Sequence, residues 1–321
     1  SMTNPSCSGR PILEVSGLTV GFETAAGRVM AAEDVSFCLR QGETLALVGE
    51  TGCGKSVVAS AIMQLLPRNA SVRGHAEFAG RDLLALSEKD MAEIRGKEIA
   101  IVFQNPSLSL NPIIRIAEQV AEPLQVHEHA SRHKSIKTAE EMLHRLGLGS
   151  REAQMYPFQF SGGMNQRAMI ATSMILTPKV IIADEPSHGL DAGLVDETMK
   201  EMMKIKEQIG SSLLLITHDL TLARRFSERM AVMYCGEIVE TGKSEEIFTK
   251  PLHPYTRALL DCLPERGFHP IPGSSPSMIN PPPGCKFRPR CPHAGERCMK
   301  RPPIVEGAAK DCDREVRCWL Y

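Results

Sequence analysis

Hydrophobic residues in the first part of the chain occur in short runs whose spacing predicts β-strands. Residues 12–15, 18–22 and 35–39 form alternating or β-branched runs of strand length. Runs of this kind are typical of an antiparallel sheet. The next apolar run, 44–48, is followed by a glycine-rich segment and then by an apolar helix start at 57–63. The pattern therefore predicts an antiparallel sheet that leads into a strand, a loop and a helix.

Between about residues 100 and 250, strand-like and helical patterns alternate. Residues 180–183 and 213–216 are almost continuously apolar, as expected for parallel strands that are covered on both faces. Residues 113–176 are mostly helical in pattern and interrupt the alternation, which predicts an inserted helical lobe. Residues 192–209 carry apolar groups at helical spacing, which we interpret as a core face rather than a binding groove: Leu194, Thr198, Met199, Met202, Met203 and Ile205.

The composition changes sharply after Lys250. Thirteen of the chain's 22 prolines lie between Pro251 and Pro303. Proline lacks a backbone donor and fixes φ, so such a segment cannot form long helices or central strands. We expect an appended tail without a core of its own, ordered only if something cross-links it.

The overall composition is that of a soluble enzyme. The 321 residues are 42% hydrophobic and carry a net charge of −1, which gives no general attraction to nucleic acid or anionic lipid. No apolar stretch approaches the ~18–20 residues of a membrane span. We therefore expect a cytosolic protein whose role at a membrane, if it has one, is peripheral.

The glycine-rich segment has the spacing of a phosphate-binding loop. Residues 49–56 read Gly-Glu-Thr-Gly-Cys-Gly-Lys-Ser, between the predicted strand and the predicted helix. In that context, backbone N–H groups and a helix N-terminus bind phosphates, the lysine reaches the terminal phosphates, and the serine ligates Mg²⁺. The sequence predicts a nucleoside triphosphate site formed by Gly49, Glu50, Thr51, Gly52, Cys53, Gly54, Lys55 and Ser56.

Polar residues at the ends of two later strands complete the expected site. Asp184 and Glu185 directly follow the run 180–183, where two adjacent carboxylates would be costly without a cation. We expect Asp184 near Mg²⁺ and Glu185 beside the attacking water. His218 follows the second apolar run in the same way.

At this point the chain resembles the ATP-binding cassette (ABC) ATPases. Residues 160–167 read Phe-Ser-Gly-Gly-Met-Asn-Gln-Arg, similar to the signature loop of that family. The motifs also follow one another in the family's order, and the resemblance covers roughly residues 11–250. It implies an α/β P-loop ABC fold: a RecA-like core, an antiparallel β subdomain and a helical subdomain inserted at about 105–176.

The resemblance also implies roles for individual residues. Phe22 would stack on adenine, Gln104 would sense the γ-phosphate and share Mg²⁺ with Ser56 and Asp184, and His218 would contact the γ-phosphate. The catalytic residues would be Glu185, His218 and Gln104, and the remaining nucleotide contacts would include Val57, Ser161, Gly162, Gly163 and Asp191.

The signature loop implies a dimer. Ser161 and the two glycines open a helix and offer backbone N–H groups to an anion. By the resemblance, that anion is ATP on a facing subunit, in a two-site sandwich, and Asp191 lies in the loop that spans the dimer. Two residues depart from the family pattern: His188 in this loop and Phe160 at the start of the signature. His188 is interpreted as a harmless surface residue, with a variant contact across the dimer as the alternative.

The tail, residues 251–321, is similar to the C-terminal extension of the oligopeptide, dipeptide and nickel importer ATPases. The similarity rests on residues 251–260, 284–292 and 316–320. It implies peripheral attachment to the cytoplasmic side of the inner membrane, with two permease subunits, a second homologous ATPase and an extracytoplasmic binding protein as partners, and no nucleic acid. The substrate would be a peptide, nickel or a metal chelate.

Five of the ten cysteines lie in the last 37 residues. The resemblance implies a [4Fe–4S] cluster on Cys285, Cys291, Cys298 and Cys318. Independently, four thiolates in a proline-rich segment favour metal or cluster ligation; zinc and disulfides stay open, as does Cys312 in place of Cys318. Residues 284–321 hold nine Lys/Arg against five Asp/Glu, which we expect to offset the charge of the cluster.

The sequence thus predicts an ATP-hydrolysing subunit of an importer. The loop around residues 104–112 is expected to pass motion to the permease. The alternatives are a soluble ABC-type ATPase and a metal- or redox-sensing regulator that is not coupled to transport.

Overall fold

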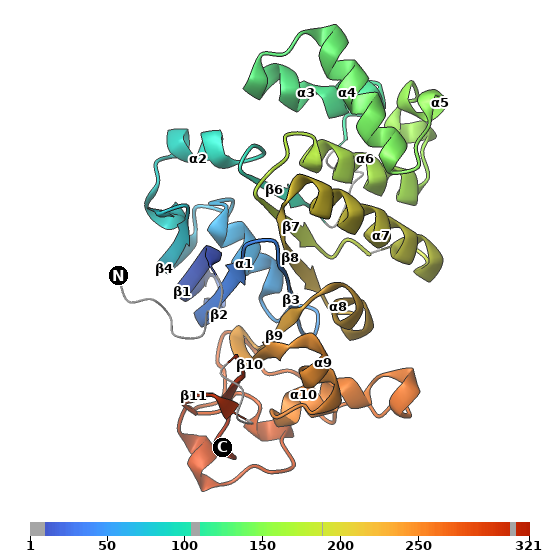
Figure 1. The fold of residues 1–321 in the computed structure, drawn as a ribbon. Coiled ribbons are helices and arrows are strands. Elements are labelled where there is room, and N and C mark those ends of the chain that lie inside the picture. The colour runs from blue at the N-terminus through green and yellow to red at the C-terminus, as the bar shows by residue number, and fades with distance from the viewer. Residues whose placement is uncertain (1–9, 104–109, 188, 309–312) are drawn as a thin grey trace. The chain divides into compact units, whose positions relative to one another are not determined.

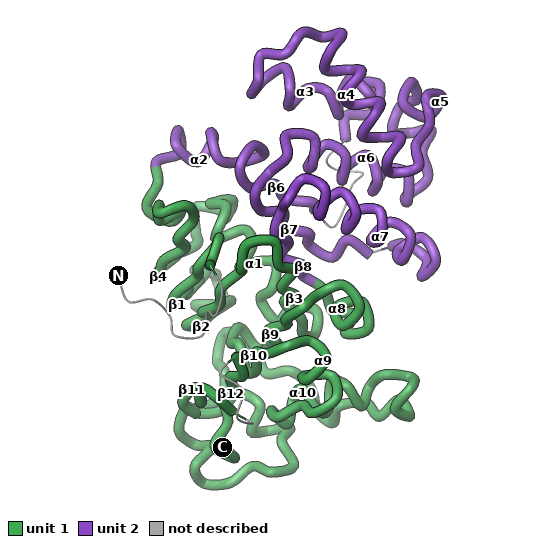
Figure 2. Tube along the Cα trace, viewed as in Figure 1, with its two compact units in different colours: residues 1–86, 217–321 green, residues 87–216 purple. Residues whose placement is uncertain are grey.

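The computed structural model describes residues 10–103, 110–187, 189–308 and 313–321. The chain divides into two compact units, residues 1–86 with 217–321 and residues 87–216 (Figure 2). Figure 1 shows the fold, with helices and strands labelled where there is room. Gln104, His188 and Cys312 lie outside the described residues.

The first unit contains the predicted antiparallel sheet. Its strand order is β2-β1-β4-β5, and β1 pairs antiparallel with both β2 and β4. The runs 12–15 and 18–22, expected as separate strands, belong to one strand with bulges between residues 15 and 21. The elements up to residue 86 are β1 (Pro11–Thr24), β2 (Gly27–Arg40), β3 (Thr44–Val48), α1 (Lys55–Ile62), β4 (Ala70–Phe78), β5 (Arg81–Asp82) and η1 (Leu83–Ala85).

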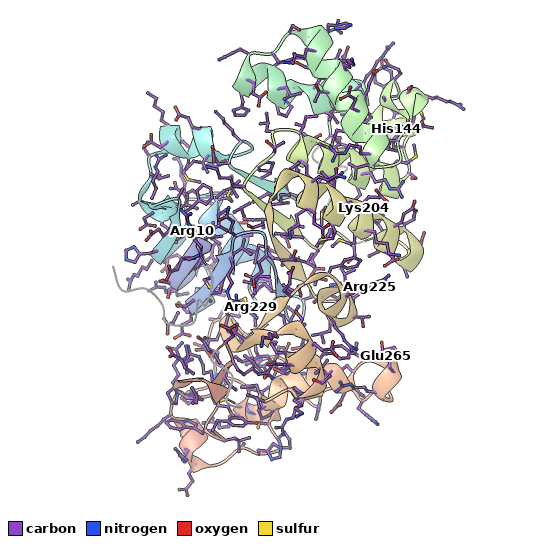
Figure 3. All side chains as sticks on the ribbon, in the orientation of Figure 1. Arg10, His144, Lys204, Arg225, Arg229 and Glu265 are labelled. Carbon is purple, nitrogen blue, oxygen red and sulfur yellow. The ribbon has the colours of Figure 1, made fainter. Side chains whose placement is uncertain are left out.

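The later part of the first unit forms a mixed sheet around β3. Strand β9 pairs parallel with β3 and antiparallel with β10, which pairs with β12 and through it with β11. On β9, Arg229 (labelled in Figure 3) forms a buried ion pair with Glu43, 3.2 Å from Nη1 to Oε1. The elements are α8 (Leu220–Phe226), β9 (Arg229–Tyr234), β10 (Glu237–Lys243), α9 (Ser244–Thr249), α10 (Pro254–Asp261), η4 (Pro264–Arg266), η5 (Arg288–Arg290), η6 (Glu296–Met299), β11 (Ile304–Glu306) and β12 (Glu315–Arg317).

The second unit combines parallel strands with helices. Strands β6, β7 and β8 pair in parallel, and β7 and β8 coincide with the two apolar runs of the sequence. The helices between β6 and β7 lie where the helical lobe was predicted. The elements are α2 (Glu88–Ile94), β6 (Ile99–Val102), α3 (Ile116–Glu128), α4 (Arg132–Arg145), α5 (Ser150–Ala153), η3 (Pro157–Gln159), α6 (Gly162–Met174), β7 (Val180–Asp184), α7 (Ala192–Ile209) and β8 (Ser212–Thr217).

Helix α7 has the core face that its spacing predicts. Thr198, Met199, Met202 and Ile205 are buried, while Leu194 and Met203 are half-buried. Among the described residues, no helix is both long and apolar enough to cross a bilayer.

The tail packs into the core of the first unit, whereas its proline content led us to expect order only through a cross-link. Tyr255 of α10 and Phe287 are 0% and 1% exposed and pack on Tyr234 of β9, with ring centroids 4.5 and 5.3 Å from that of Tyr234. Proline excludes long regular elements, but it does not prevent irregular backbone from burying aromatic side chains. The tail is therefore ordered by packing on the unit that carries β3.

Arg288 and Arg297 line one cavity together with Cys285, Cys291, Cys298 and Cys318, in agreement with the expected positive surround, whereas five other basic residues of the tail form ion pairs. Their partners are carboxylates of the neighbouring sheets: Glu33 for Lys286, Glu50 for Arg290, Glu237 for Arg301, Glu240 for Arg314 and Asp34 for Arg317. These ion pairs attach the tail to β2, β10 and the loop after β3.

Candidate functional site

The phosphate loop joins β3 to α1 in the first unit. The five residues of β3 are all buried, so the loop starts from a fixed strand end. Thr51, Gly52 and Ser56 are exposed, whereas Cys53 and Lys55 are buried. Gly54 adopts φ 100° ahead of α1, a conformation that favours glycine. Ser56, which the sequence assigns to Mg²⁺, is therefore exposed, whereas Lys55, which it assigns to the terminal phosphates, is buried.

Two glycines of the loop are required by close packing. A Cβ atom on Gly49 would lie 2.3 Å from the carbonyl oxygen of Met233, and one on Gly54 would lie 2.1 Å from that of Ala31. Both contacts are with backbone, which cannot move aside as a flexible side chain can. The glycines therefore let the loop lie directly against β9 and β2.

The amino group of Lys55 closes the loop on itself. Its Nζ donates hydrogen bonds to the carbonyl oxygens of Gly49 and Glu50, at 2.8 and 2.9 Å. The backbone N–H of Cys53 also donates to Glu50 O, at 3.2 Å. Burial raises the pKa of the Cys53 thiol, so this side chain is a neutral packing group rather than a thiolate.

Three further predicted residues lie in the same unit. Phe22 is half-buried on β1, and Val57 is half-buried in the first turn of α1. His218 is exposed immediately after β8, ahead of Asp219, whose carboxylate caps α8 by accepting from Leu222 N at 3.0 Å.

The paired carboxylates lie in the second unit, at the end of β7. Asp184 is half-buried, and Glu185 is 7% exposed with φ 48°. A left-handed conformation is uncommon for a non-glycine residue, and such outliers concentrate at functional sites. A hydrogen bond of 2.8 Å from Glu185 N to Ile216 O fixes this backbone.

The signature residues form the N-terminus of α6. The hydroxyl of Ser161 caps the helix by accepting from Met164 N at 3.3 Å. Ser161 and Gly162 are exposed, and Gly163 is buried against Leu194 of α7. Helix α6 has 13 residues, long enough to place a partial positive charge at this end. Asp191 caps α7 in the same unit by accepting from Leu194 N at 3.0 Å.

The predicted site residues therefore fall into two groups. The phosphate loop, Phe22 and His218 lie in the first unit, and Asp184, Glu185, Asp191 and the signature lie in the second. Gln104, expected at the γ-phosphate, and His188 lie outside the described residues.

The four cysteines that the sequence predicts as cluster ligands line one cavity of about 380 Å³: Cys285, Cys291, Cys298 and Cys318. All four are free thiols. Burial raises the pKa of Cys285 to about 11, although backbone N–H groups of Phe287 and Arg288 oppose the shift. Within the described ranges, no three His, Cys, Asp or Glu side chains converge as ligands of a metal ion.

The backbone shapes this cavity. The N–H of Cys285 donates to the carbonyl oxygen of Cys298 at 2.9 Å. Gly284 precedes it with φ 78°, and a Cβ there would lie 2.3 Å from the same oxygen. His253 also lines the cavity and is 1% exposed. Burial lowers the pKa of His253 to about 3, so its ring is neutral, and its Nδ1 accepts from Tyr255 N at 3.0 Å.

The sequence reasoning missed residues of the tail that contact the phosphate loop. Tyr255 accepts a hydrogen bond from Glu50 N at 3.0 Å, and Arg290 forms an ion pair with the Glu50 carboxylate at 3.2 Å. The available signal was a glutamate inside an anion-binding loop, which calls for a cation nearby.

Comparison with known proteins finds relatives that match almost the whole chain. A family model described as "ABC transporter" matches residues 32–188, and one described as "Oligopeptide/dipeptide transporter, C-terminal region" matches residues 239–298. The oligopeptide transport ATP-binding protein OppD of Escherichia coli is 38% identical over 315 residues, covering 95% of this chain and 94% of the relative. The chain belongs to the ABC transporter family. Its resemblance to the oligopeptide and dipeptide importer ATPases is thereby confirmed.

Other ABC proteins give the same result. The dipeptide transport ATP-binding protein DppD of Lactococcus lactis is 45% identical, over 87% of this chain and 82% of its own length. A solved structure of the cassette MJ0796, titled as a dimeric post-hydrolysis state bound to ADP and Pi, has a TM-score of 0.66 at 28% identity and covers 72% of this chain and 98% of its own. The structure of cbiO1 from Clostridium perfringens has a TM-score of 0.65 at 26% identity, over 75% and 92%. The predicted ABC cassette fold is confirmed, and the chain is an ABC ATPase.

Proposed function

We propose that this chain is the ATP-hydrolysing subunit of a binding-protein-dependent ABC importer for peptides. The observation that carries the proposal is the match along almost the whole chain to oligopeptide and dipeptide transport ATPases, tail included. The relatives reported above are named for peptides, so peptides are favoured over nickel or metal chelates.

The loop geometry supports the binding half of the reaction. Displacing the Lys55 amino group from the carbonyl oxygens of Gly49 and Glu50 would free it for the terminal phosphates. The exposed Ser56 hydroxyl and Asp184 would hold Mg²⁺ together with Gln104, and the ion would neutralise charge on the phosphates. Phe22 would stack on adenine.

Glu185 would act as the group that polarises the attacking water. Its carboxylate follows β7 and is almost buried, and its backbone is held in an unusual conformation. A fixed carboxylate near neutral pH is a base that can accept a proton from water in the transition state. His218 would contact the γ-phosphate.

The proposed assembly is a sandwich of two ATPase subunits. Ser161, Gly162 and Gly163 would bind the γ-phosphate held by the facing subunit, and Asp191 would lie at the dimer interface. The partners would be a second homologous ATPase, two permease subunits and an extracytoplasmic binding protein, with this chain at the cytoplasmic side of the membrane.

We further propose that Cys285, Cys291, Cys298 and Cys318 hold a [4Fe–4S] cluster. In support, the four thiols line one shared cavity, and a [4Fe–4S] cluster takes four thiolate ligands. The thiols would release their protons to solvent as the thiolates bind iron. The cluster would serve as a cross-link between η5, η6 and the C-terminal end of the chain.

Uptake of a labelled tripeptide tests the transport function. Cells that lack the gene should lose uptake, and the wild-type gene should restore it, whereas Lys55→Ala should not. Affinity capture of the tagged chain from detergent-solubilised membranes should bring two permease subunits and a second ATPase. Normal peptide uptake without the gene, or capture without any permease, would contradict the proposal.

A further inference from the structure

The phosphate loop of this chain contains an acidic residue, Glu50, whose negative charge opposes the binding of phosphate. A carboxylate within a loop that binds a polyphosphate repels the ligand unless its charge is compensated. The side chain of Glu50 is 30% exposed, so water alone screens it only in part. The compensating cation comes from the tail, 240 residues further along the chain.

Arg290 supplies that cation through a two-pronged contact. Its Nη1 lies 3.2 Å from Glu50 Oε2 and its Nη2 lies 3.4 Å from Oε1. The guanidinium is itself fixed, because Nε donates to Pro272 O at 2.9 Å and Nη1 to the Ser275 hydroxyl at 3.2 Å. Its side chain is only 5% exposed, and bidentate arginine–carboxylate pairs are among the stronger and more directional polar contacts.

Tyr255 fixes the backbone of the same residue. Its hydroxyl accepts from Glu50 N at 3.0 Å. The ring is fully buried between Tyr234 and Phe287, with centroids 4.5 and 5.5 Å away. The Glu50 amide, at the start of the phosphate loop, is thereby tied to the core.

A second connection runs beneath the loop. Lys286 Nζ donates to Cys235 O at 3.0 Å, and Gly236 N donates to Cys53 O of the phosphate loop at 2.9 Å. Lys286 follows Cys285 and Arg290 precedes Cys291, so both connections start beside cysteines of the cavity. The order of the cysteine segment is thus transmitted to the loop by two separate side chains.

We propose that Arg290 and Tyr255 are positioning residues of the ATP site, through which the C-terminal tail holds Glu50 neutralised and the phosphate loop in its binding conformation. The inference rests on the ATP-binding role proposed for the loop, and it adds the tail of the same chain to that site. An intact tail is then a condition for tight ATP binding, before any partner subunit is present.

The test is a titration of the full chain with Mg²⁺ and a fluorescent trinitrophenyl-ATP. Arg290→Gln should weaken binding by roughly tenfold, the order expected when one charge-assisted pair is lost. Tyr255→Phe removes one oxygen and should weaken binding by about threefold. Arg257→Gln is the matched control, because this tail arginine bonds only Pro251 O and the Tyr321 hydroxyl among the partners that the structure gives it.

Rescue separates charge compensation from a general loss of structure. In Glu50→Gln/Arg290→Gln the uncompensated carboxylate is gone, so affinity should recover most of the loss seen in Arg290→Gln. In the assembled transporter, Arg290→Gln should raise KM for ATP more than it lowers kcat. A double variant as weak as Arg290→Gln would overturn the proposal, as would wild-type affinity in both Arg290→Gln and Tyr255→Phe.

Lys55→Ala distinguishes this inference from the proposed function. If Lys55→Ala weakens nucleotide binding and the two tail variants do not, the positioning role is wrong and the ATP site stands. If Lys55→Ala itself leaves binding unchanged, the assignment of the phosphate loop fails, and the positioning role fails with it.

Discussion

The Nζ atom of Lys55 lies 2.8 Å from the carbonyl oxygen of Gly49, six residues earlier in the same loop. The lysine thus bridges both ends of the segment that is expected to surround the phosphates. These hydrogen bonds hold the loop closed. When nucleotide binds, the amino group can leave its neutral carbonyl partners for anionic phosphate oxygens, which are better acceptors for a cation.

Replacing Lys55 should therefore weaken nucleotide binding itself. We expect Lys55→Ala to raise the dissociation constant for Mg²⁺-ATP by about tenfold or more, because the contact is made in the ground state as well as in the transition state. Isothermal titration with the full chain measures this. Lys200→Ala on α7, where the lysine pairs with Asp196 on the helix surface, is the control, and equal affinities in the two variants would contradict the prediction.

Glu185 should affect turnover and not binding. Glu185→Gln keeps a side chain of the same size but removes the base, so the ATPase rate of the assembled complex should fall by about two to four orders of magnitude, with ATP affinity retained. Rapid-quench measurement of phosphate release from the complex provides the rate. Glu201→Gln, a carboxylate paired with Lys204 on the outer face of α7, should hydrolyse normally. Near-normal hydrolysis by Glu185→Gln would refute the assignment.

The parts of the fold that follow from local sequence could be predicted. The strand, loop and helix predicted at 44–62 agree with the structure because the motif fixes the backbone through its glycines. A Cβ atom on Gly49 or Gly54 would lie 2.3 or 2.1 Å from a backbone oxygen, so both positions require glycine. Strands β7 and β8 were evident because parallel buried strands carry continuous apolar runs.

The contacts between distant segments could not be predicted. Nothing in the local sequence of Arg290 indicates that its partner is Glu50, and the packing of Tyr255 and Phe287 on Tyr234 orders a tail whose proline content led us to expect order only through a cross-link. The left-handed backbone of Glu185 also depends on tertiary context, because its N–H is fixed by Ile216 of β8. Pairing of this kind is specified by the whole fold rather than by any one segment.

Gly162, at the exposed N-terminus of α6, is predicted to be needed for ATP hydrolysis by the assembled complex but not for ATP binding by the isolated chain. Gly162 is exposed, and a Cβ there would meet nothing closer than Leu190 at 3.8 Å, so Gly162→Arg should fold. A bulky cation at this position should block a facing nucleotide. We expect the ATPase rate of the assembled complex to fall by at least about tenfold, since a signature donor acts on transition-state charge, while ATP binding by the isolated chain is unchanged.

The control for Gly162→Arg is Glu141→Arg at an exposed position of α4 in the same unit. It should leave both measurements at wild-type values. The isolated chain should also be a poor ATPase whose activity rises when the second ATPase and the permease are added. Full activity of the isolated Gly162→Arg chain and of its complex would rule out the sandwich assembly.

The buried His253 predicts a pH dependence of the stability of the tail. Burial, with the charge of Arg257, lowers its pKa from 6.5 to about 3, against a hydrogen bond with the backbone of Arg317. Between pH 6.5 and pH 3 the unfolded chain therefore binds up to one proton more than the folded chain. The folded state is most stable above pH 6.5, and its stability falls as the pH is lowered toward 3. Lowering the pH from 7.5 to 5.5 should therefore reduce the free energy of unfolding by about 1.4 kcal/mol through this residue.

His253→Asn tests this dependence, because asparagine keeps a helix-capping oxygen but does not titrate. Urea unfolding followed by the fluorescence of Trp319, the single tryptophan of the chain, should show a smaller loss between pH 7.5 and 5.5 in the variant than in the wild-type protein. Equal losses in both would mean that His253 is not the group responsible.

The cavity between η5, η6 and the C-terminal end makes the cluster proposal testable. Anaerobically purified protein should be brown and contain about four irons per chain, with broad absorption near ~400 nm from thiolate-to-iron charge transfer. Trp319 lines the same cavity, so energy transfer to the cluster should quench its fluorescence, and removal of iron by a chelator should restore it.

Replacing Cys285, Cys291, Cys298 or Cys318 by Ser should lose the iron and expose residues 270–321 to protease. Cys262→Ser is the control, because this thiol lies outside the cavity and bonds to Ala258 O and His269 O. One zinc and no iron in anaerobic protein would replace the cluster by a zinc site, and loss of iron in Cys312→Ser with retention in Cys318→Ser would change the fourth ligand.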